Sequence, residues 1–246
     1  MKTTQLIHIA VCLLALAGIS YADDPKTKKS AIFEAVGSGR LQEVKDMIAN
    51  DKNVVNERDK DGRTPLSYLA NLTKMTFSLG NLNTPSATLK ADSSGDSDMA
   101  TLLIEAGADL NTTDNSERTP LINAITSHKV NVAKLLIEKG CNVNQAMANG
   151  DNQGFTPLHV AVGHGQVEII KMLVSKGAKL NSQTKDGSTP LHIAAMCDSK
   201  AGATVLMQLG ADSSIKNQKG QTPSDVALAA GYTKTAGIIS QKNDKK

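Results

Sequence analysis

The sequence predicts an all-α solenoid of stacked helix–turn–helix units, because two short motifs return along the chain in step. The first motif opens with Thr-Pro, and its members begin at Thr64, Thr119, Thr156, Thr189 and Thr222. The second is a glycine-led turn, and its members begin at Gly107, Gly140, Gly177 and Gly210. Successive members are 55, 37, 33 and 33 residues apart in the first motif and 33, 37 and 33 in the second. Two motifs that share one period define a repeat array.

Each Thr-Pro pair is expected to begin a helix. A threonine hydroxyl can accept a hydrogen bond from an unpaired N–H there, and proline suits the first helical position because its missing N–H would have no partner anyway. After Thr156, small apolar residues run as far as Val162, and a Gly-His-Gly turn ends the run. Residues 166–174 then supply a second helix with a periodic apolar face, and Gly177 falls where that helix ends. No such unit can bury its apolar face alone, so the units must stack.

A 33-residue period that carries Thr-Pro-Leu-His, as at Thr156 and Thr189, resembles the ankyrin repeat. The resemblance extends from about Ser30 to about Gln241. It implies pairs of short helices joined by β-turn fingers, with finger tips and inner-helix ends lining one concave surface. It also implies that His159 and His192 are structural, bonding near their own threonine and towards the next unit.

The predicted solenoid domain covers residues 30–241 and contains about six units, including a cap at each end. The units are expected at about 30–58, 59–114, 115–151, 152–184, 185–217 and 218–241. The first unit lacks Thr-Pro, and the last has Ser224 and Asp225 where the third full motif has leucine and histidine. A seven-residue linker, 23–29, precedes the stack, and a basic tail, 242–246, follows it.

Two insertions interrupt the period. The larger, at about 72–94, is rich in Ser, Thr and Asn but also carries Met75 and Phe77, and it places Gly95 in the turn between two helices. The smaller adds four residues near 145–150 and lengthens one finger. Long surface insertions cost little chain entropy. For both insertions, a neutral loop and a partner-binding loop therefore remain as alternatives.

The composition suits a repeat protein and gives no support to several other classes. Aromatic residues make up 2% of the chain and tryptophan is absent, which fits cores built from small aliphatic side chains between helix pairs. Charged residues make up 21% and the net charge is +3. Neither value supports binding to nucleic acid or to a membrane surface by long-range electrostatics.

The amino terminus resembles a cleaved secretory signal. Lys2 supplies a positive start, residues 6–19 are almost wholly apolar, and Ser20-Tyr21-Ala22 has small residues at the first and third places before a cut. The apolar run is shorter than the span of about 20 residues that a membrane helix needs. We expect residues 1–22 to be removed and Asp23 to begin an exported chain, periplasmic in a bacterium or alternatively secreted. An uncleaved anchor is the other interpretation.

Two cysteines, Cys141 and Cys197, remain after the predicted cleavage. They belong to units two apart and to opposite ends of their helices, and neighbouring helices already lie about 10 Å apart. A disulfide needs Cα atoms within about 7 Å. The sequence therefore predicts that no intramolecular disulfide joins them.

The sequence predicts no enzyme, cofactor or metal site. It contains no glycine-rich phosphate loop, no nucleophile elbow and no C-x-x-C or H-E-x-x-H spacing. His164 and Cys197 occupy equivalent turns of adjacent units and could converge, but two ligands are fewer than the three or four that a stable zinc site uses. A metal- or ligand-dependent enzyme is kept as the least favoured alternative.

What remains is recognition of a protein partner. The motif positions predict that the finger tips and inner-helix ends present the candidate binding residues Arg63, Arg118, Gln153, Phe155, His164, Lys185, Met196 and Cys197. Phe155 is the expected anchor, since aromatic, arginine and methionine side chains dominate interface hot spots. The alternative is that Phe155 only packs between fingers.

We therefore expect a monomeric, non-catalytic scaffold or adaptor that binds an unidentified protein. It would bind no nucleic acid and would not insert into a membrane after signal cleavage. The alternative function is that of a secreted effector, or of an immunity- or inhibitor-type protein that blocks a host or competitor protein.

Overall fold

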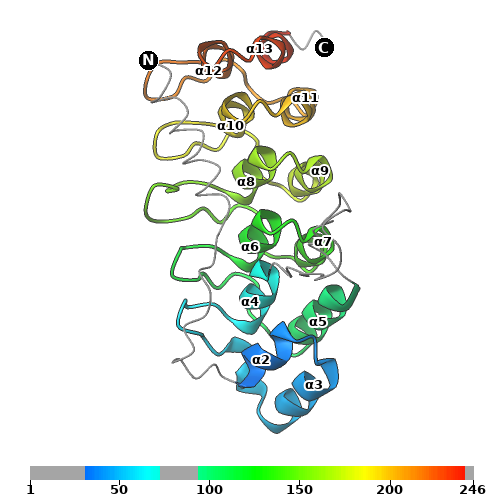
Figure 1. Cartoon of the computed structure of the whole chain (residues 1–246). Coiled ribbons are helices and arrows are strands. Elements are labelled where there is room, and N and C mark those ends of the chain that lie inside the picture. Colours follow the sequence, from blue (N-terminus) through cyan, green and yellow to red (C-terminus); the bar gives the residue numbers. More distant parts are fainter. Residues whose placement is uncertain (1–30, 73–93, 242–246) are drawn as a thin grey trace, which may run out of the picture.

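The computed structural model describes residues 31–72 and 94–241. In these residues the chain forms an elongated stack with two columns of helices (Figure 1). Inner helices form the middle column, outer helices form the second column, and long loops project from the other side of the inner column. No strand occurs in the described ranges. The predicted fold class, an all-α solenoid of stacked helix pairs with finger loops, is confirmed.

Each unit contributes one inner and one outer helix. The inner helices are α2 (Ala31–Gly37), α4 (Pro65–Asn71), α6 (Pro120–Thr126), α8 (Pro157–Gly163), α10 (Pro190–Met196) and α12 (Pro223–Ala229). The outer helices are α3 (Leu41–Asn50), α5 (Ser94–Glu105), α7 (Val130–Glu138), α9 (Val167–Ser175), α11 (Lys200–Gln208) and α13 (Thr233–Ser240). A short 3-10 helix, η1 (Lys52–Asn56), follows α3.

The Thr-Pro motif begins five of the inner helices, as predicted. The Thr64 hydroxyl accepts the N–H of Ser67, and the same bond recurs at the start of α6 and α12. In α8 the imidazole of His159 completes the cap, because its Nδ1 accepts the N–H of Thr156 at 3.2 Å. His192 repeats this contact with Thr189 at 3.1 Å. Proline follows the threonine in every case, where no N–H is needed.

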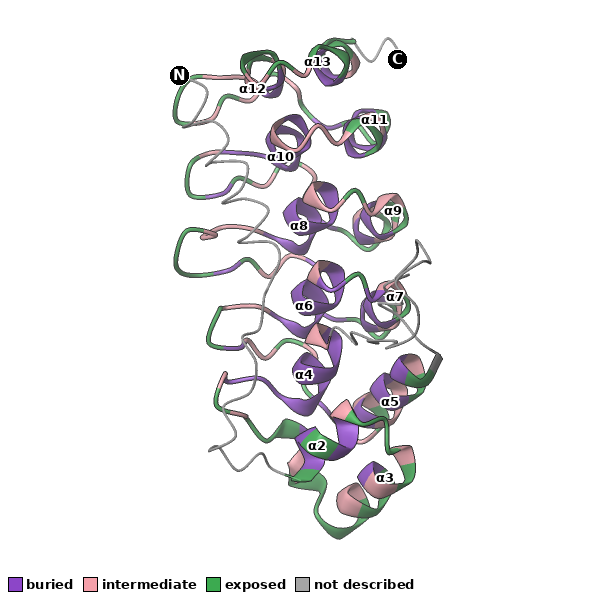
Figure 2. Ribbon diagram, viewed as in Figure 1, coloured by how far each residue is buried: buried purple, intermediate pink, exposed green. Residues whose placement is uncertain are grey.

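The core lies between the two columns and between successive units. One leucine of each full inner helix is at most 1% exposed, and these residues are Leu66, Leu121, Leu158 and Leu191. Alanine, valine and isoleucine make up most of the other buried apolar residues of the inner helices, and Figure 2 shows α4, α6, α8 and α10 as largely buried. Small side chains let the helices of successive units approach closely. The stack is therefore held by contacts between units rather than by a single globular centre.

A row of four asparagines joins the first five units in succession, and the sequence analysis did not single it out. The Asn56 amide donates to the carbonyl oxygen of Gly107 at 3.1 Å and accepts the N–H of Asp109 at 2.9 Å. Equivalent side chains accept a backbone N–H of the following unit at 2.7–3.0 Å, and they are Asn111, Asn144 and Asn181. Each stands after Val or Leu. The recurring Val-Asn or Leu-Asn dipeptide is the sequence pattern from which the row could have been predicted.

A buried ion pair fixes the helix that follows the larger insertion. Lys129 is fully buried, and its Nζ lies 2.9 Å from the Asp96 carboxylate and 2.8 Å from the carbonyl oxygen of Leu69. Asp96 lies in the first turn of α5, where a negative charge is favourable. The expectation that Gly95 sits in the turn between helices is wrong, because α5 begins at Ser94 and includes it. The ion pair holds this extra helical turn against α4 and α7.

Replacing Leu158 with alanine should lower the free energy of unfolding by about 2–5 kcal/mol, because the side chain is fully buried and its loss leaves a cavity. Denaturant unfolding measures the change. The control is Leu228→Ala at a position 56% exposed on α12, where we expect a change within about 0.5 kcal/mol. Equal losses in the two variants would contradict the assigned register.

Candidate protein-binding site

The candidate site is built on the loops that join the outer helix of one unit to the inner helix of the next, which we call fingers. One backbone hydrogen bond joins each of three of the four pairs of neighbouring fingers. These bonds run from the N–H of Asn115 to Asp61, from Lys185 to Gln153 and from Gln218 to Asp186, each 2.9 Å long. The finger tips therefore form a braced row beside the inner helices (Figure 1).

One step of this row differs from the others. The equivalent bond from Asn152 to Ser116 does not occur in the described structure, and this step coincides with the four-residue insertion. The extra residues fold back on their own finger, since Met147 donates its N–H to Phe155 at 2.9 Å and accepts that of Gly154 at 2.8 Å. The insertion therefore makes one finger longer than the rest, which we call the long finger (residues 145–155).

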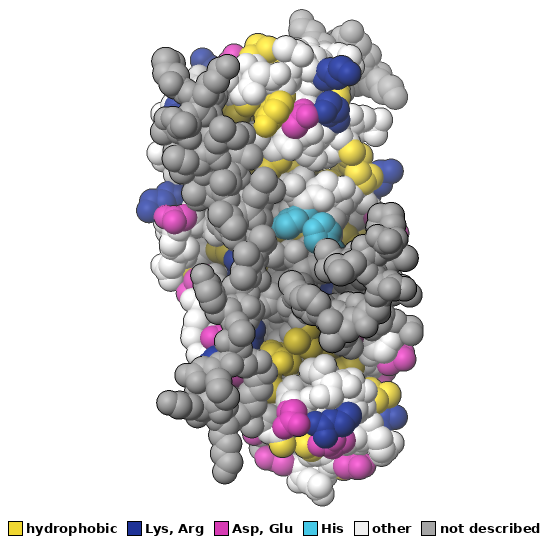
Figure 3. All heavy atoms as spheres, viewed as in Figure 1, with side chains coloured by type: hydrophobic (Ala, Val, Ile, Leu, Met, Phe, Trp, Pro, Cys, Tyr) yellow, Lys and Arg dark blue, Asp and Glu magenta, His cyan; other side chains and the backbone are white. Residues whose placement is uncertain are grey.

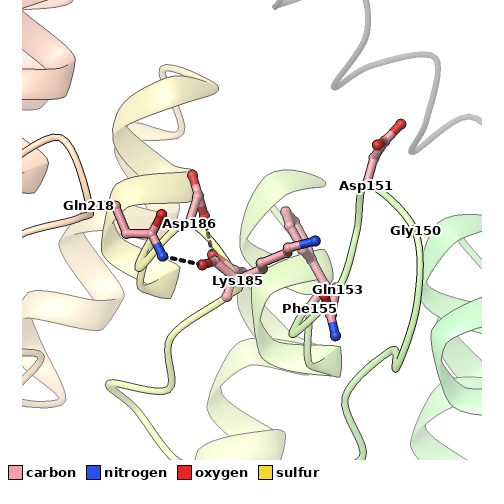
Figure 4. Close-up of a pocket in the computed structure, with 8 residues that line it drawn as sticks. Gly150, Asp151, Gln153, Phe155, Lys185, Asp186 and Gln218 are labelled. Atoms are coloured by element: carbon pink, nitrogen blue, oxygen red, sulfur yellow. Dashed lines mark hydrogen bonds between the residues drawn. The ribbon is translucent and has the colours of Figure 1, made fainter.

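A pocket of about 300 Å³ opens between the long finger and the next one. Its lining residues come from three successive fingers and are Gly150, Asp151, Gln153, Phe155, Thr184, Lys185, Asp186 and Gln218. Three of the predicted binding residues, Gln153, Phe155 and Lys185, thus meet at one place (Figure 4). Gly150 and Asp151 of the long finger line it as well, although the sequence analysis did not select them.

Phe155 lies half-buried at the base of this pocket. Its ring centroid is 5.4 Å from that of His159, which belongs to α8 directly behind the finger. The ring therefore packs on its own unit and also lines the open pocket. It is less exposed than the sequence analysis assumed.

The prediction that Arg63 belongs to the binding surface is wrong. Its side chain was expected on the binding surface, but the residue is only 7% exposed. Its guanidinium lies 2.8 Å from the carboxylates of Asp59 and Asp61 and 5.0 Å from the ring centre of Tyr68. Arg63 therefore braces its own finger and is not available to a partner. Arg118 is half-buried in the next finger, where its N–H bonds to Asp114.

The remaining candidates, His164, Met196 and Cys197, lie at the far ends of α8 and α10. A seven-residue helix is about 10 Å long, which separates this group from the finger pocket. The ring of His164 packs edge-on against that of His128 at 5.0 Å, and histidines gather on this face in Figure 3. The predicted set thus divides into two groups instead of forming one patch.

Burial sets the protonation of the histidines behind the fingers. It lowers the pKa of His159 to about 4, and it lowers the pKa of His192 as well. His164 also has its pKa lowered to about 4, through burial and then the nearby charge of His128. Because Nδ1 of His159 accepts from Thr156, its proton sits on Nε2, which lies 3.3 Å from the carbonyl oxygen of Ser188 in the next finger. The neutral imidazole therefore joins two units, as the resemblance implied.

Metal-ligating side chains do not cluster in the part of the chain that the structure describes. Within 31–72 and 94–241, no three His, Cys, Asp or Glu side chains come together as a metal site would require. No disulfide joins Cys141 and Cys197 in the described structure, and burial raises the pKa of the Cys141 thiol to about 12. Among the same residues, no helix is long and apolar enough to cross a membrane.

Comparison with known families agrees with the geometry. Stacked helix pairs with braced fingers define a protein-interaction scaffold. A model described as "Ankyrin repeats (3 copies)" matches residues 88–184, and a second, "Ankyrin repeats (many copies)", matches residues 164–206. Residues 88–206 therefore contain ankyrin repeats. A search of curated proteins finds no match.

One similar solved structure is described as "Bd0816 Predatory Endopeptidase from Bdellovibrio bacteriovorus in complex with immunity protein Bd3460". A chain of that complex is 27% identical to this one, with a TM-score of 0.68. The alignment covers 88% of this chain and 100% of the other. The similarity therefore spans nearly the whole stack and not one or two repeats.

Acid should destabilise the protein through His159. His159 has a pKa of about 6.5 in the unfolded chain and about 4 in the folded protein. The stability that the neutral imidazole contributes to the folded protein is therefore complete above pH 6.5 and is lost as pH falls towards 4. Linkage gives a loss on the order of 2 kcal/mol between pH 7.5 and pH 5. Denaturant unfolding of the protein and of His159→Gln at both pH values measures it. The variant should lose this part of the pH dependence, whereas the exposed-site control His128→Gln should keep it.

Proposed function

We propose that the chain is a non-catalytic scaffold or adaptor that binds a folded protein through its finger side. The observation that carries the proposal is the pocket beside the long finger, where an aromatic ring, two amides and three charged side chains meet. Interface hot spots combine buried aromatic anchors with a polar surround of this kind. The braced fingers present these groups on a rigid base, which limits the entropy lost on binding.

A second candidate function, an immunity or inhibitor role, is favoured by the similar complex. Of the two proteins in its description, we infer that the matched chain is the immunity protein, because the alignment covers that whole chain with an ankyrin stack. At 27% identity over 88% of this chain, the likeness exceeds the fold alone. In this role the chain would bind an endopeptidase and inhibit it. A secreted effector that binds a host protein is the remaining alternative.

We further propose that the protein acts as an exported monomer, periplasmic or secreted. The support is the amino-terminal sequence, whose residues 1–22 lie outside the described ranges. A cleaved chain would work without membrane insertion. An inhibitor of an exported peptidase would need this location.

Export should remove residues 1–22, because a positive start, an apolar run and small residues before the cut form a signal-peptidase substrate. Amino-terminal sequencing of the protein recovered from the exported fraction should begin at Asp23. Recovery of a chain that retains Met1 in the cytoplasm would contradict the proposed location.

Truncating Phe155 to alanine should weaken partner binding by about 2 kcal/mol or more, because the partner would desolvate the ring at the centre of the contact. Capture from the native exported fraction, and inhibition of endopeptidases from the same source, provide the binding assay. The matched control is Leu209→Ala, which removes an apolar side chain that is 40% exposed on the outer column. It should leave binding unchanged.

Two further measurements separate the alternatives. Phe155 also packs on His159. Phe155→Leu keeps an apolar side chain at this contact, so comparing it with Phe155→Ala tests whether a loss of binding comes from unfolding. A chain lacking residues 72–94, most of which lie outside the described ranges, tests the larger insertion. Binding that survives Phe155→Ala but is abolished by this deletion would transfer the recognition role to the insertion.

A further inference from the structure

We propose that the pocket between the long finger and its neighbour is a socket for an arginine side chain of the partner protein. The inference rests on the proposed function and specifies what the partner must present. It follows from the acceptor groups, the ring and the charge balance of the pocket.

The pocket offers hydrogen-bond acceptors that the chain itself leaves unused. In the described structure, the exposed Asp151 carboxylate makes no hydrogen bond or ion pair, and the side-chain amide of Gln153 makes none either. Asp186 supplies a second carboxylate, held in place by bonds from the Ser188 hydroxyl and backbone N–H. Burial would raise the pKa of Asp186, but bonds from Thr184 and Ser188 outweigh it and lower the pKa. Both Asp186 oxygens thus already accept bonds within their own finger. The unused acceptors are the Asp151 carboxylate and the Gln153 amide oxygen, which suit a group rich in N–H donors, and a guanidinium has five.

The ring at the base of the pocket fits the same occupant. A planar guanidinium stacks on an aromatic face, whereas the more strongly hydrated ammonium of lysine gains less from such a surface. Phe155 packs on His159, whose low pKa keeps that imidazole neutral, so the supporting ring adds no repulsive charge. Gly150, which has no side chain, leaves the rim open beside Asp151.

The local charge favours a cation. Two carboxylates and the single ammonium of Lys185 line the pocket, so its net charge is negative although the whole chain carries +3. Lys185 is anchored through its backbone, which donates to Gln153 at 2.9 Å and accepts from the Gln218 amide at 2.7 Å. Its exposed side chain extends towards Phe155 and Gln153 in Figure 4, and its ammonium forms no ion pair in the described residues. An entering arginine must therefore share the pocket with Lys185, whose charge opposes it.

The test uses N-acetyl-arginine amide as the probe and the isotope-labelled chain as the receptor, followed by NMR chemical shifts. The probe should shift the backbone amide signals of Gln153, Phe155 and Lys185. N-acetyl-citrulline amide, which has nearly the same shape without the charge, should bind at least several-fold more weakly. Exposed charge pairs contribute about 0.2–1 kcal/mol, so Asp151→Asn should weaken binding of the arginine probe by about 1.4- to 5-fold. Lys185→Ala should strengthen it by a similar factor, and the distant control Asp98→Asn should leave it unchanged.

Each opposite result overturns the proposal. Tighter binding of N-acetyl-glutamate amide, with affinity lost in Lys185→Ala, would show that the pocket prefers an anion. Equal binding of the arginine and citrulline probes would show that charge plays no part, and no shift at the pocket amides would show that it is no socket. These failures are distinct from failure of the proposed function. Partner capture that still depends on Phe155 would keep the protein-binding site while removing arginine as its ligand.

Discussion

The structure depends on the burial of inner-helix leucines between successive units. A seven-residue helix is too short to be stable alone in water, and each helix pair exposes an apolar face until a neighbour covers it. Leu158, at the centre of the stack, is fully buried only because flanking units pack on α8. Polar links then fix the spacing, through the asparagine row on one edge and the imidazoles of His159 and His192 behind the fingers. Apolar contacts hold the stack together, and these directional bonds set its register.

The candidate site arises where that regularity is broken. A solenoid presents the same backbone in every unit, so a distinctive surface has to come from side chains or from insertions. Four extra residues lengthen one finger, one backbone bond is absent between it and the preceding finger, and the pocket lies on its other side, towards the following finger. The neighbouring finger remains tied to the next one through Gln218, so one wall of the pocket is braced. A small insertion on a rigid array thus creates a concave polar site without any change to the core.

The two ends of the inner helices have different chemistry. At the finger end, an aromatic ring lies among ionised and amide groups, which suits recognition of a charged side chain. At the opposite end, His128 and His164 pack against each other, and Nε2 of His164 is buried without a hydrogen-bond partner in the described structure. Burial at that end lowers the pKa of His164 and keeps the imidazole neutral. The separation explains why one continuous patch of the predicted residues does not form.

The sequence by itself determined the fold class and the positions of five inner helices, because period and capping chemistry are local properties of the chain. The resemblance to the ankyrin repeat implied the structural roles of His159 and His192. Val-Asn and Leu-Asn pairs recur in step with the motifs and mark the asparagine row in the sequence. Their role as links between units, however, depends on which backbone groups lie opposite them in the stack. Only the tertiary structure decided which candidate residues are accessible and which meet. Arg63 is buried because Asp59 and Asp61 close around it, and Phe155 joins Gln153 and Lys185 because three fingers align in space. Burial and proximity across units depend on how the repeats stack, which motif spacing alone does not specify.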